Sequence, residues 1–199
     1  MTPTYAYFDS SIIISYLLGS KDRFYNQVKY IFEKKIKNKE MIGLISKLTL
    51  LETIDVIKRR IVERTDKSIL DEFTDEERKS YLKSIIDEKI KDFIDILTRM
   101  EHKKYIVLAD FTMVDLKQII NEAYNYSLKY FGDIKRYSRC MICRNNYEHY
   151  SYKGLGWIDF THILLAINLA ADEFITADKS FKDLKNDPEF RDIEIKIIS

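Results

Sequence analysis

Short apolar segments that alternate with helical segments are the feature that most constrains the fold of this chain. Apolar runs of strand length occupy residues 4–8, 41–46 and 105–109, and the last part of the chain is expected to form a helix, a strand, a short helix and a strand. Strands that alternate with helices form parallel sheets covered on both faces. The sequence therefore predicts an α/β domain with a central parallel sheet of four to five strands.

The intervening segments carry helix signals. Apolar residues spaced by three and four predict amphipathic helices, and Ser or Asp marks where several of them begin. Thr74 and Glu77 form a capping box at the start of the longest of these helices. The expected helices cover residues from Ser10 or Ser11 onward, 21–37, 46–64, 74–100 and 112–130. We expect residues 132–157, which are rich in Tyr and Arg, to be irregular.

Composition limits the classes of protein that this chain can represent. It has 199 residues, of which 46% are hydrophobic and 33% charged, as expected for a single globular domain. The net charge of +1 excludes a uniformly basic nucleic-acid binder but permits a local basic patch. The sequence contains neither a membrane-length apolar run nor a signal-peptide pattern at its start, so we expect a cytoplasmic protein without membrane association.

Four acidic residues lie where the apolar segments end or the helices begin: Asp9, Glu52, Asp159 and Asp178. In a parallel α/β sheet these positions meet at one edge, although they are scattered along the chain. Carboxylates a few Å apart cannot all stay ionised without a counter-charge, and hard divalent cations prefer oxygen ligands. The pattern therefore predicts a site for Mg²⁺ or Mn²⁺.

Each of these acids also has a purely structural explanation. Asp9 and Asp178 are suited to cap helices, and Asp159 suits a first helical turn because the helix dipole favours an acid there. Glu52 alone could be a solvated glutamate. The four positions together favour the metal site.

A resemblance to the PIN-domain family, which includes the VapC-type toxin ribonucleases, rests on four short segments. These are YFDSS with Asp9, SKLTLLE with Glu52, WIDFTHILLA with Asp159, and FITADKSF with Asp178. Their order, their spacing from the apolar runs and the Thr-x-Asp ending all resemble this family. The resemblance implies a single PIN-like three-layer α/β/α domain over residues 1–199.

The resemblance also implies an activity and partners. It implies a metal-dependent endoribonuclease that cleaves single-stranded RNA to leave a 5′-phosphate, with an antitoxin protein as a partner in toxin–antitoxin pairs. PIN-like proteins are often homodimers, and the helix from residue 74 to 100 could supply a dimer surface or complete the core. Residues 65–102 and 132–157 are expected to be insertions relative to a compact PIN domain.

The chemistry of phosphodiester hydrolysis suggests roles for the same four acids. Phosphodiester hydrolysis needs an activated water and neutralisation of phosphate charge, and carboxylate-held metal ions supply both. The predicted catalytic and metal-binding residues are therefore Asp9, Glu52, Asp159 and Asp178. We expect Ser11 and Thr176 to orient these carboxylates. His162, one turn after Asp159, either contacts a ligand or phosphate or is simply paired with a neighbouring carboxylate.

The Tyr- and Arg-rich segment before Asp159 is a candidate RNA-binding element. Cations neutralise phosphates and tyrosine rings stack on unpaired bases, and the alternative is a solvated loop packed by its own tyrosines. The candidate RNA-binding residues are Arg136, Arg139, Arg144 and Tyr147. Cys140 and Cys143 in the same segment resemble half of a zinc site, but a second ligand pair is missing, which favours ordinary thiols.

Two other functions are compatible with the pattern. One is a catalytically silent PIN-like protein that binds nucleic acid or acts as a scaffold. The other is a phosphatase or phosphotransferase of the haloacid-dehalogenase type, which also begins with an Asp at the end of a strand. That class requires a second Asp two residues later, where this chain has Ser11, so we place it behind the other two.

Overall fold

The protein, described by a computed structural model over residues 2–65, 72–109, 111, 113–130, 132–139, 146–153 and 155–198, is built around a five-stranded parallel sheet. The strand order is β3-β2-β1-β6-β7, and every neighbouring pair is parallel. The strands are β1 (Thr4–Phe8), β2 (Met41–Ser46), β3 (Ile106–Ala109), β6 (Glu173–Thr176) and β7 (Glu194–Ile197). The predicted parallel sheet is confirmed.

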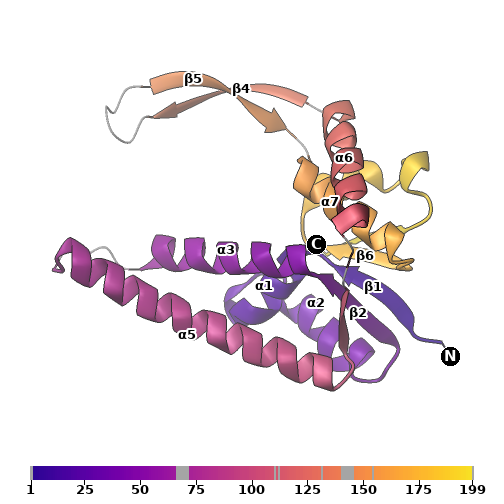
Figure 1. The fold of residues 1–199 in the computed structure, drawn as a ribbon, viewed down its shortest axis with the longest axis horizontal. Helices are drawn as coiled ribbons and strands as arrows, with labels where there is room; N and C mark the ends of the chain where they lie inside the picture. The colour runs from indigo at the N-terminus through magenta and orange to yellow at the C-terminus, as the bar shows by residue number, and fades with distance from the viewer. Residues whose placement is uncertain are drawn as a thin grey trace.

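Helices cover both faces of the sheet (Figure 1). The helices are α1 (Ser10–Leu18), α2 (Tyr25–Tyr30), α3 (Lys47–Arg64), α5 (Asp75–His102), α6 (Met113–Lys129) and α7 (Trp157–Asn168). Side chains of neighbouring β1 residues pack into hydrophobic clusters on opposite faces of the sheet, because side chains alternate along a strand. Phe8 packs with α1, α2 and α5 residues, whereas Tyr7 packs with residues of α6 and α7. The three-layer α/β/α architecture is therefore confirmed.

The helix starts follow the capping signals of the sequence. Glu77 N donates to Thr74 Oγ1 at 3.3 Å, and Thr74 N donates to Glu77 Oε2 at 2.8 Å, which forms the predicted capping box of α5. Short 3₁₀ segments complete the C-terminal part: η3 (Lys179–Leu184) and η4 (Pro188–Phe190).

The single helix predicted for residues 21–37 is wrong. That region contains the end of a 3₁₀ turn, η1 (Gly19–Lys21), then α2, and then a π-helical turn, η2 (Ile31–Ile36). Asp22 causes the break, because its Oδ1 accepts hydrogen bonds from Ser15 Oγ at 2.5 Å and from Phe24 N at 2.9 Å. A side chain that bonds the local backbone in this way competes with helix continuation.

The order of the strands reverses between β1 and β6. The chain builds the sheet outward from β1 through β2 to β3, and later adds β6 and β7 on the other side of β1. In open α/β sheets, ligands bind outside the carboxyl ends of the strands at such a switch point. Asp9 follows β1 directly, and Asp178 lies two residues after β6, so both stand at this position.

Residues 132–157, which we expected to be irregular, contain a second sheet. β4 (Gly132–Arg139) and β5 (Asn146–Lys153) form an antiparallel pair that extends from the ends of α6 and α7 (Figure 1). The prediction failed because charged residues occur at alternate and at adjacent positions of residues 132–139, as in Asp133, Lys135 and Arg136, which hides the alternation that identifies a half-buried strand.

The ends of α3 and α5 also project from the sheet, on the same side of the molecule as the β4–β5 ribbon (Figure 1). Residues 75–102 of the expected helical insertion form α5, which packs on α3. That this helix and the ribbon are insertions in a PIN-like domain stays a prediction. Among the described helices, none combines the length and the apolar character needed to cross a lipid bilayer.

A substitution at Gly43 would test how tightly β2 packs against its neighbours. A Cβ at this position would lie 2.5 Å from Phe8 Cε2 and 3.1 Å from Ile106 Cγ2, both in the core. Overpacking of a core costs about 1–3 kcal/mol. We therefore expect Gly43→Ala to lower the free energy of unfolding by about that amount in urea denaturation. An unchanged midpoint would show that Phe8 moves aside without cost.

Candidate functional site

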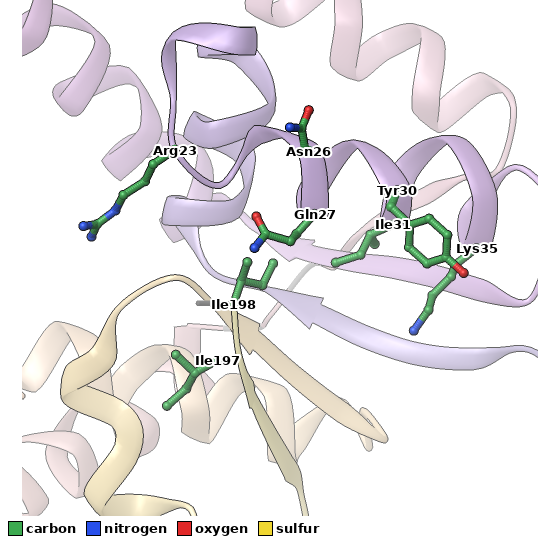
Figure 2. A pocket seen from close by; sticks show the side chains of 8 residues that line it. All are labelled: Arg23, Asn26, Gln27, Tyr30, Ile31, Lys35, Ile197 and Ile198. Atoms are coloured by element: carbon green, nitrogen blue, oxygen red, sulfur yellow. The ribbon is translucent and has the colours of Figure 1, made fainter.

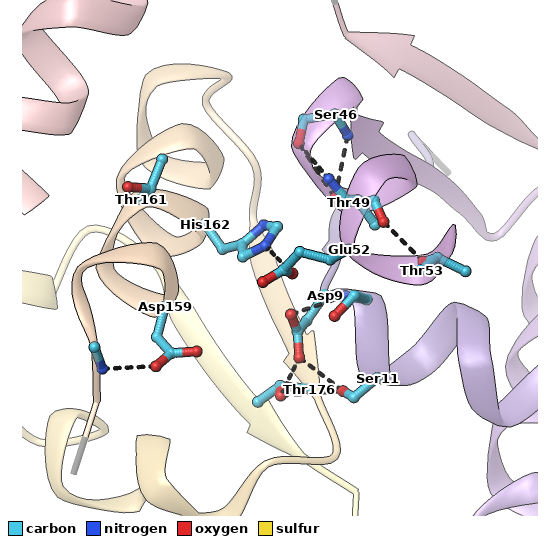
Figure 3. Close-up of polar contacts among 12 residues, drawn as sticks. Asp9, Ser11, Ser46, Thr49, Glu52, Thr53, Asp159, Thr161, His162 and Thr176 are labelled. Carbon is cyan, nitrogen blue, oxygen red and sulfur yellow. Dashed lines mark hydrogen bonds and ion pairs between the residues drawn. The ribbon is translucent and has the colours of Figure 1, made fainter. Parts of the chain in front are cut away.

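Asp9 is held rigidly at the carboxyl end of β1. It caps α1, with Oδ1 accepting from Ser10 N at 2.8 Å. Its Oδ2 accepts from Ser11 Oγ at 2.7 Å and from Thr176 Oγ1 at 2.8 Å (Figure 3). The side chain is 7% exposed. Because Ser11 Oγ also accepts from Ala177 N at 2.9 Å, these contacts join the ends of β1 and β6 around one carboxylate.

Glu52 reaches the same place from the second turn of α3. Its Oε2 lies 2.6 Å from His162 Nε2, which comes from α7. His162 is almost completely buried, and its Nδ1 lies 2.9 Å from the hydroxyl of Tyr7 on β1. The capping residue of α3, Ser46, contacts the same hydroxyl at 2.7 Å, as does Thr49 at 3.1 Å. A chain of hydrogen bonds therefore runs from the core to Glu52.

The two members of the Glu52–His162 pair stabilise each other's charged form. Burial lowers the pKa of His162, but the hydrogen bond to Glu52 and the nearby carboxylates outweigh burial and raise it. Burial raises the pKa of Glu52, but the hydrogen bond and charge of His162, with a hydrogen bond from Ser10, bring it below its ordinary value. Burial raises the pKa of Tyr7, so its hydroxyl keeps its proton.

Asp159 faces Asp9 and Glu52 from the first turn of α7 (Figure 3). Its Oδ2 accepts from Gly156 N at 2.7 Å, which is the capping contact of the helix. Asp178 is exposed and caps η3, with Oδ1 accepting from Ser180 N at 2.8 Å. Both acids therefore use one oxygen as a cap while the other oxygen has no hydrogen bond to the described part of the chain. The structural and the metal-binding explanations of these positions are compatible.

Three other carboxylates act on Asp159. Burial first, and then the charges of Asp9, Asp178 and Glu52, raise its pKa from 3.8 to about 6, against the opposing effect of the Gly156 hydrogen bond. The charge of Asp159 in turn contributes to the raised pKa of His162. Nearby like charges raise the pKa of a carboxyl because they disfavour its ionised form. The site thus has an excess of oxygen donors and negative charge, which suits a hard divalent cation.

The carboxylates do not form one symmetrical cluster. Ligand atoms of Asp9, Glu52 and His162 all lie within 4.8 Å of one another, and neither Asp159 nor Asp178 belongs to that group. His162 is the weakest member as a metal ligand, because both of its ring nitrogens already have hydrogen-bond partners. Of the four acids, Asp9 and Glu52 belong to this group, and Asp159 faces them from α7 (Figure 3).

Neither a protein-family model nor a curated protein matches this sequence. A solved structure does match the fold: the Mycobacterium tuberculosis toxin VapC20, described as a toxin that cleaves the sarcin–ricin loop. The TM-score is 0.51 at 11% sequence identity, and the match covers 90% of this chain and 94% of the toxin. The fold is PIN-like. At this identity the comparison supports the fold, and the chemistry of the site rests on the residues described above.

Some of the remaining predicted residues contact the site, some lie on the β4–β5 ribbon, and others lie outside the described residues. Ser11 and Thr176 contact Asp9, and His162 contacts Glu52. That these residues orient metal ligands stays a prediction. The candidate RNA-binding residues Arg136, Arg139 and Tyr147 lie on the β4–β5 ribbon. Tyr147 pairs with Ser138 across the ribbon, and Arg139 pairs with Asn146. Arg144, Cys140 and Cys143 lie outside the described residues.

The buried partners of this site were not predicted from the sequence. Tyr7 was assigned only to a strand, and Ser10 only to a helix start. The alternating pattern gives a possible signal for Tyr7, because a hydroxyl inside a buried apolar strand must find a partner. The partner itself, 155 residues away on α7, leaves no local signal.

A separate depression of about 740 Å³ lies between the α2–η2 segment and the end of β7 (Figure 2). Its lining includes the cations Arg23 and Lys35 and the aromatic ring of Tyr30, but no carboxylate. It therefore offers no oxygen-rich ligand set for a cation and is distinct from the carboxylate site.

Proposed function

We propose that this protein is a metal-dependent endoribonuclease that hydrolyses phosphodiester bonds of single-stranded RNA. The observation that carries the proposal is the convergence of Asp9, Glu52 and Asp159 at the switch point of a PIN-like sheet, where burial and the charges of Asp9, Asp178 and Glu52 raise the pKa of Asp159. In this proposal Asp9, Glu52, Asp159 and Asp178 hold one or two Mg²⁺ or Mn²⁺ ions. A bound divalent ion of this kind supplies an activated water and neutralises charge on the phosphate.

The chain's own residues prepare that site in three ways. Ser11 and Thr176 fix the Asp9 carboxylate through one oxygen and leave a lone pair of the other oxygen for a cation. His162 does the same for Glu52. Asp159 can give up its proton near neutral pH when a cation replaces it, because its pKa is about 6. The acids are thus oriented before a cation or substrate arrives.

The β4–β5 ribbon supports RNA as the substrate. β5 ends at Lys153 and α7 begins at Trp157, so the base of the ribbon lies beside Asp159 in the first turn of α7. The similar toxin VapC20 is described as cleaving an RNA loop, and we extend RNA as a substrate class to this chain. An antitoxin partner, a homodimer and a cytoplasmic location stay predictions.

Cleavage of a labelled single-stranded RNA tests the proposal. We expect cleavage in Mn²⁺ or Mg²⁺, none in EDTA, and recovery when the ion is returned in excess. The products should carry 5′-phosphates, which a phosphate-dependent ligation detects. RNA binding in EDTA without cleavage in any metal would contradict the nuclease and favour the catalytically silent RNA-binding alternative.

The ribbon arginines give a separate prediction. The double variant Arg136→Ala, Arg139→Ala should bind RNA more weakly, because each arginine that contacts a phosphate releases counterions on binding. The slope of log affinity against log salt should decrease by about 1.4, at about 0.7 per phosphate contact on a single strand. The measurement is fluorescence anisotropy in EDTA at several salt concentrations.

The matched control removes two cations at the opposite edge of the sheet. Lys37 precedes β2 and Lys103 precedes β3, and both are exposed. The double variant Lys37→Ala, Lys103→Ala should keep the salt dependence of the wild type. Equal slopes in the ribbon variant and the wild type would exclude the ribbon as the RNA contact.

A further inference from the structure

The environment of Tyr7 differs from that of an ordinary core tyrosine. Its ring is fully buried and stacks on Phe174 with ring centroids 5.9 Å apart. Its hydroxyl has three hydrogen-bonding neighbours, namely Ser46, Thr49 and His162. A phenylalanine would satisfy the packing, so the hydroxyl must be explained by what it contacts. Of its neighbours, His162 alone continues to the carboxylate site.

The hydrogen bonds assign the protons of the His162 ring. Glu52 Oε2 is an acceptor, so the bond of 2.6 Å requires a proton on Nε2. In the neutral ring Nδ1 is then the acceptor and Tyr7 donates to it. In the charged ring both nitrogens are donors, and the Tyr7 oxygen accepts from Nδ1 while its own proton turns to Ser46 or Thr49. Nε2 bears a proton in both states.

We propose that Tyr7 and His162 act as a positioning pair that fixes Glu52 for the cation and keeps the imidazole itself out of the ligand set. This inference rests on the proposed function, because it takes Glu52 as a cation ligand. Tyr7 lies on β1 one residue before the strand end, and Asp9 follows that end. The pair therefore ties Glu52 on α3 to the same strand that carries Asp9, which sets the spacing of the two carboxylates.

The geometry separates this role from direct ligation. A histidine that binds a metal normally donates its other ring N–H to a carboxylate, carbonyl or water. Here the carboxylate partner occupies the nitrogen nearest the other acids, and the buried hydroxyl of Tyr7 occupies the remaining one. Ligation by His162 would require it to break one of these two bonds.

Nitrogen NMR of the imidazole and Mg²⁺ titration together test the pair. In ¹⁵N-labelled protein, with His162 assigned by comparison with His162→Gln, we expect a protonated Nε2 in EDTA and the same protonated Nε2 at saturating Mg²⁺. Loss of that proton on Mg²⁺ binding, or a ring protonated at Nδ1 alone, would overturn the proposal.

Calorimetric Mg²⁺ affinities of variants measure the positioning effect. We expect Tyr7→Phe and His162→Ala to weaken Mg²⁺ binding by about 10- to 100-fold, as loss of residues that orient metal ligands does. His162→Gln, which keeps a donor near the Nε2 position, should recover most of the affinity. Wild-type affinity in Tyr7→Phe, or equal losses in His162→Gln and His162→Ala, would contradict the pair.

The control is Tyr16→Phe, which removes the hydroxyl of a half-buried tyrosine that packs on Phe32 in the other core. It should bind Mg²⁺ like the wild type, and thermal unfolding shows that each variant folds. If the wild type binds no Mg²⁺, the proposed function fails, whereas the proton assignment of His162 in EDTA still decides whether the pair exists.

Discussion

Asp9→Asn is expected to reduce metal-dependent RNA cleavage by at least about 100-fold, since even residues that only orient ligands contribute about 10- to 100-fold. The substitution removes the negative charge from the most buried and most constrained carboxylate of the site. The amide oxygen still accepts from Ser10 N, and the hydroxyls of Ser11 and Thr176 can turn to accept from the amide group. We therefore expect a folded variant that has lost its activity.

The measurement compares initial cleavage rates in saturating Mn²⁺ with circular dichroism of the same samples. Asp87→Asn is the matched control, because it makes the same chemical change on the exposed surface of α5, where Asp87 pairs with Lys83. It should leave the rate unchanged. An Asp9→Asn protein that cleaves at the wild-type rate would remove Asp9 from the mechanism.

Asp159→Asn should have opposite effects on activity and on stability. Cleavage should be lost, because the cation loses a carboxylate opposite Asp9 and Glu52. The metal-free protein, however, should become more stable at pH 8, because the ionised Asp159 is destabilised by burial and by its acidic neighbours. Asparagine keeps an acceptor for Gly156 N without the charge.

The pH dependence of this gain follows from the raised pKa. Folded protein holds the Asp159 proton up to about pH 6, whereas the unfolded chain releases it near 3.8. The folded state thus binds more protons between these values, and wild-type stability falls as the pH rises through that window. The advantage of Asp159→Asn should therefore grow from pH 4 to pH 6 and stay constant above it.

The size of the gain can be estimated from the same shift. A change from 3.8 to about 6 corresponds to about 3 kcal/mol, and partial exposure reduces this to about 1–2 kcal/mol. Thermal unfolding in EDTA should show a midpoint about 3–6 °C above the wild type at pH 8. Added Mg²⁺ should raise the wild-type midpoint but not that of the variant. A variant less stable than the wild type at pH 8 would contradict the prediction that ionised Asp159 destabilises the folded protein.

The site residues that could be predicted from the sequence are those that lie where a strand ends or a helix begins. Asp9 follows a short apolar run and precedes a serine-started helix, so its place at the sheet edge follows from local pattern. Asp159 and Asp178 stand at comparable boundaries. Glu52 lies near the start of α3, and the resemblance to PIN domains added to the same pattern. Whether these four residues bind a cation stays a prediction for the experiments above.

The rest could not be predicted, because it depends on contacts between distant segments. The Tyr7–His162 bond joins residues 155 positions apart and fixes a proton arrangement that no spacing reveals. The break at Asp22 depends on Ser15 from the preceding helix. The β4–β5 ribbon is stabilised by backbone pairing and lacks an apolar stripe, so its strands have no periodic signal.

The most direct measurement of the central claim is a crystal structure of the wild type with Mn²⁺, located by its anomalous scattering. The account predicts a Mn²⁺ ion bound by oxygens of Asp9 and Glu52, facing Asp159, with His162 Nε2 still hydrogen-bonded to Glu52. A manganese peak on the His162 ring, or no peak among these carboxylates at saturating Mn²⁺, would contradict it.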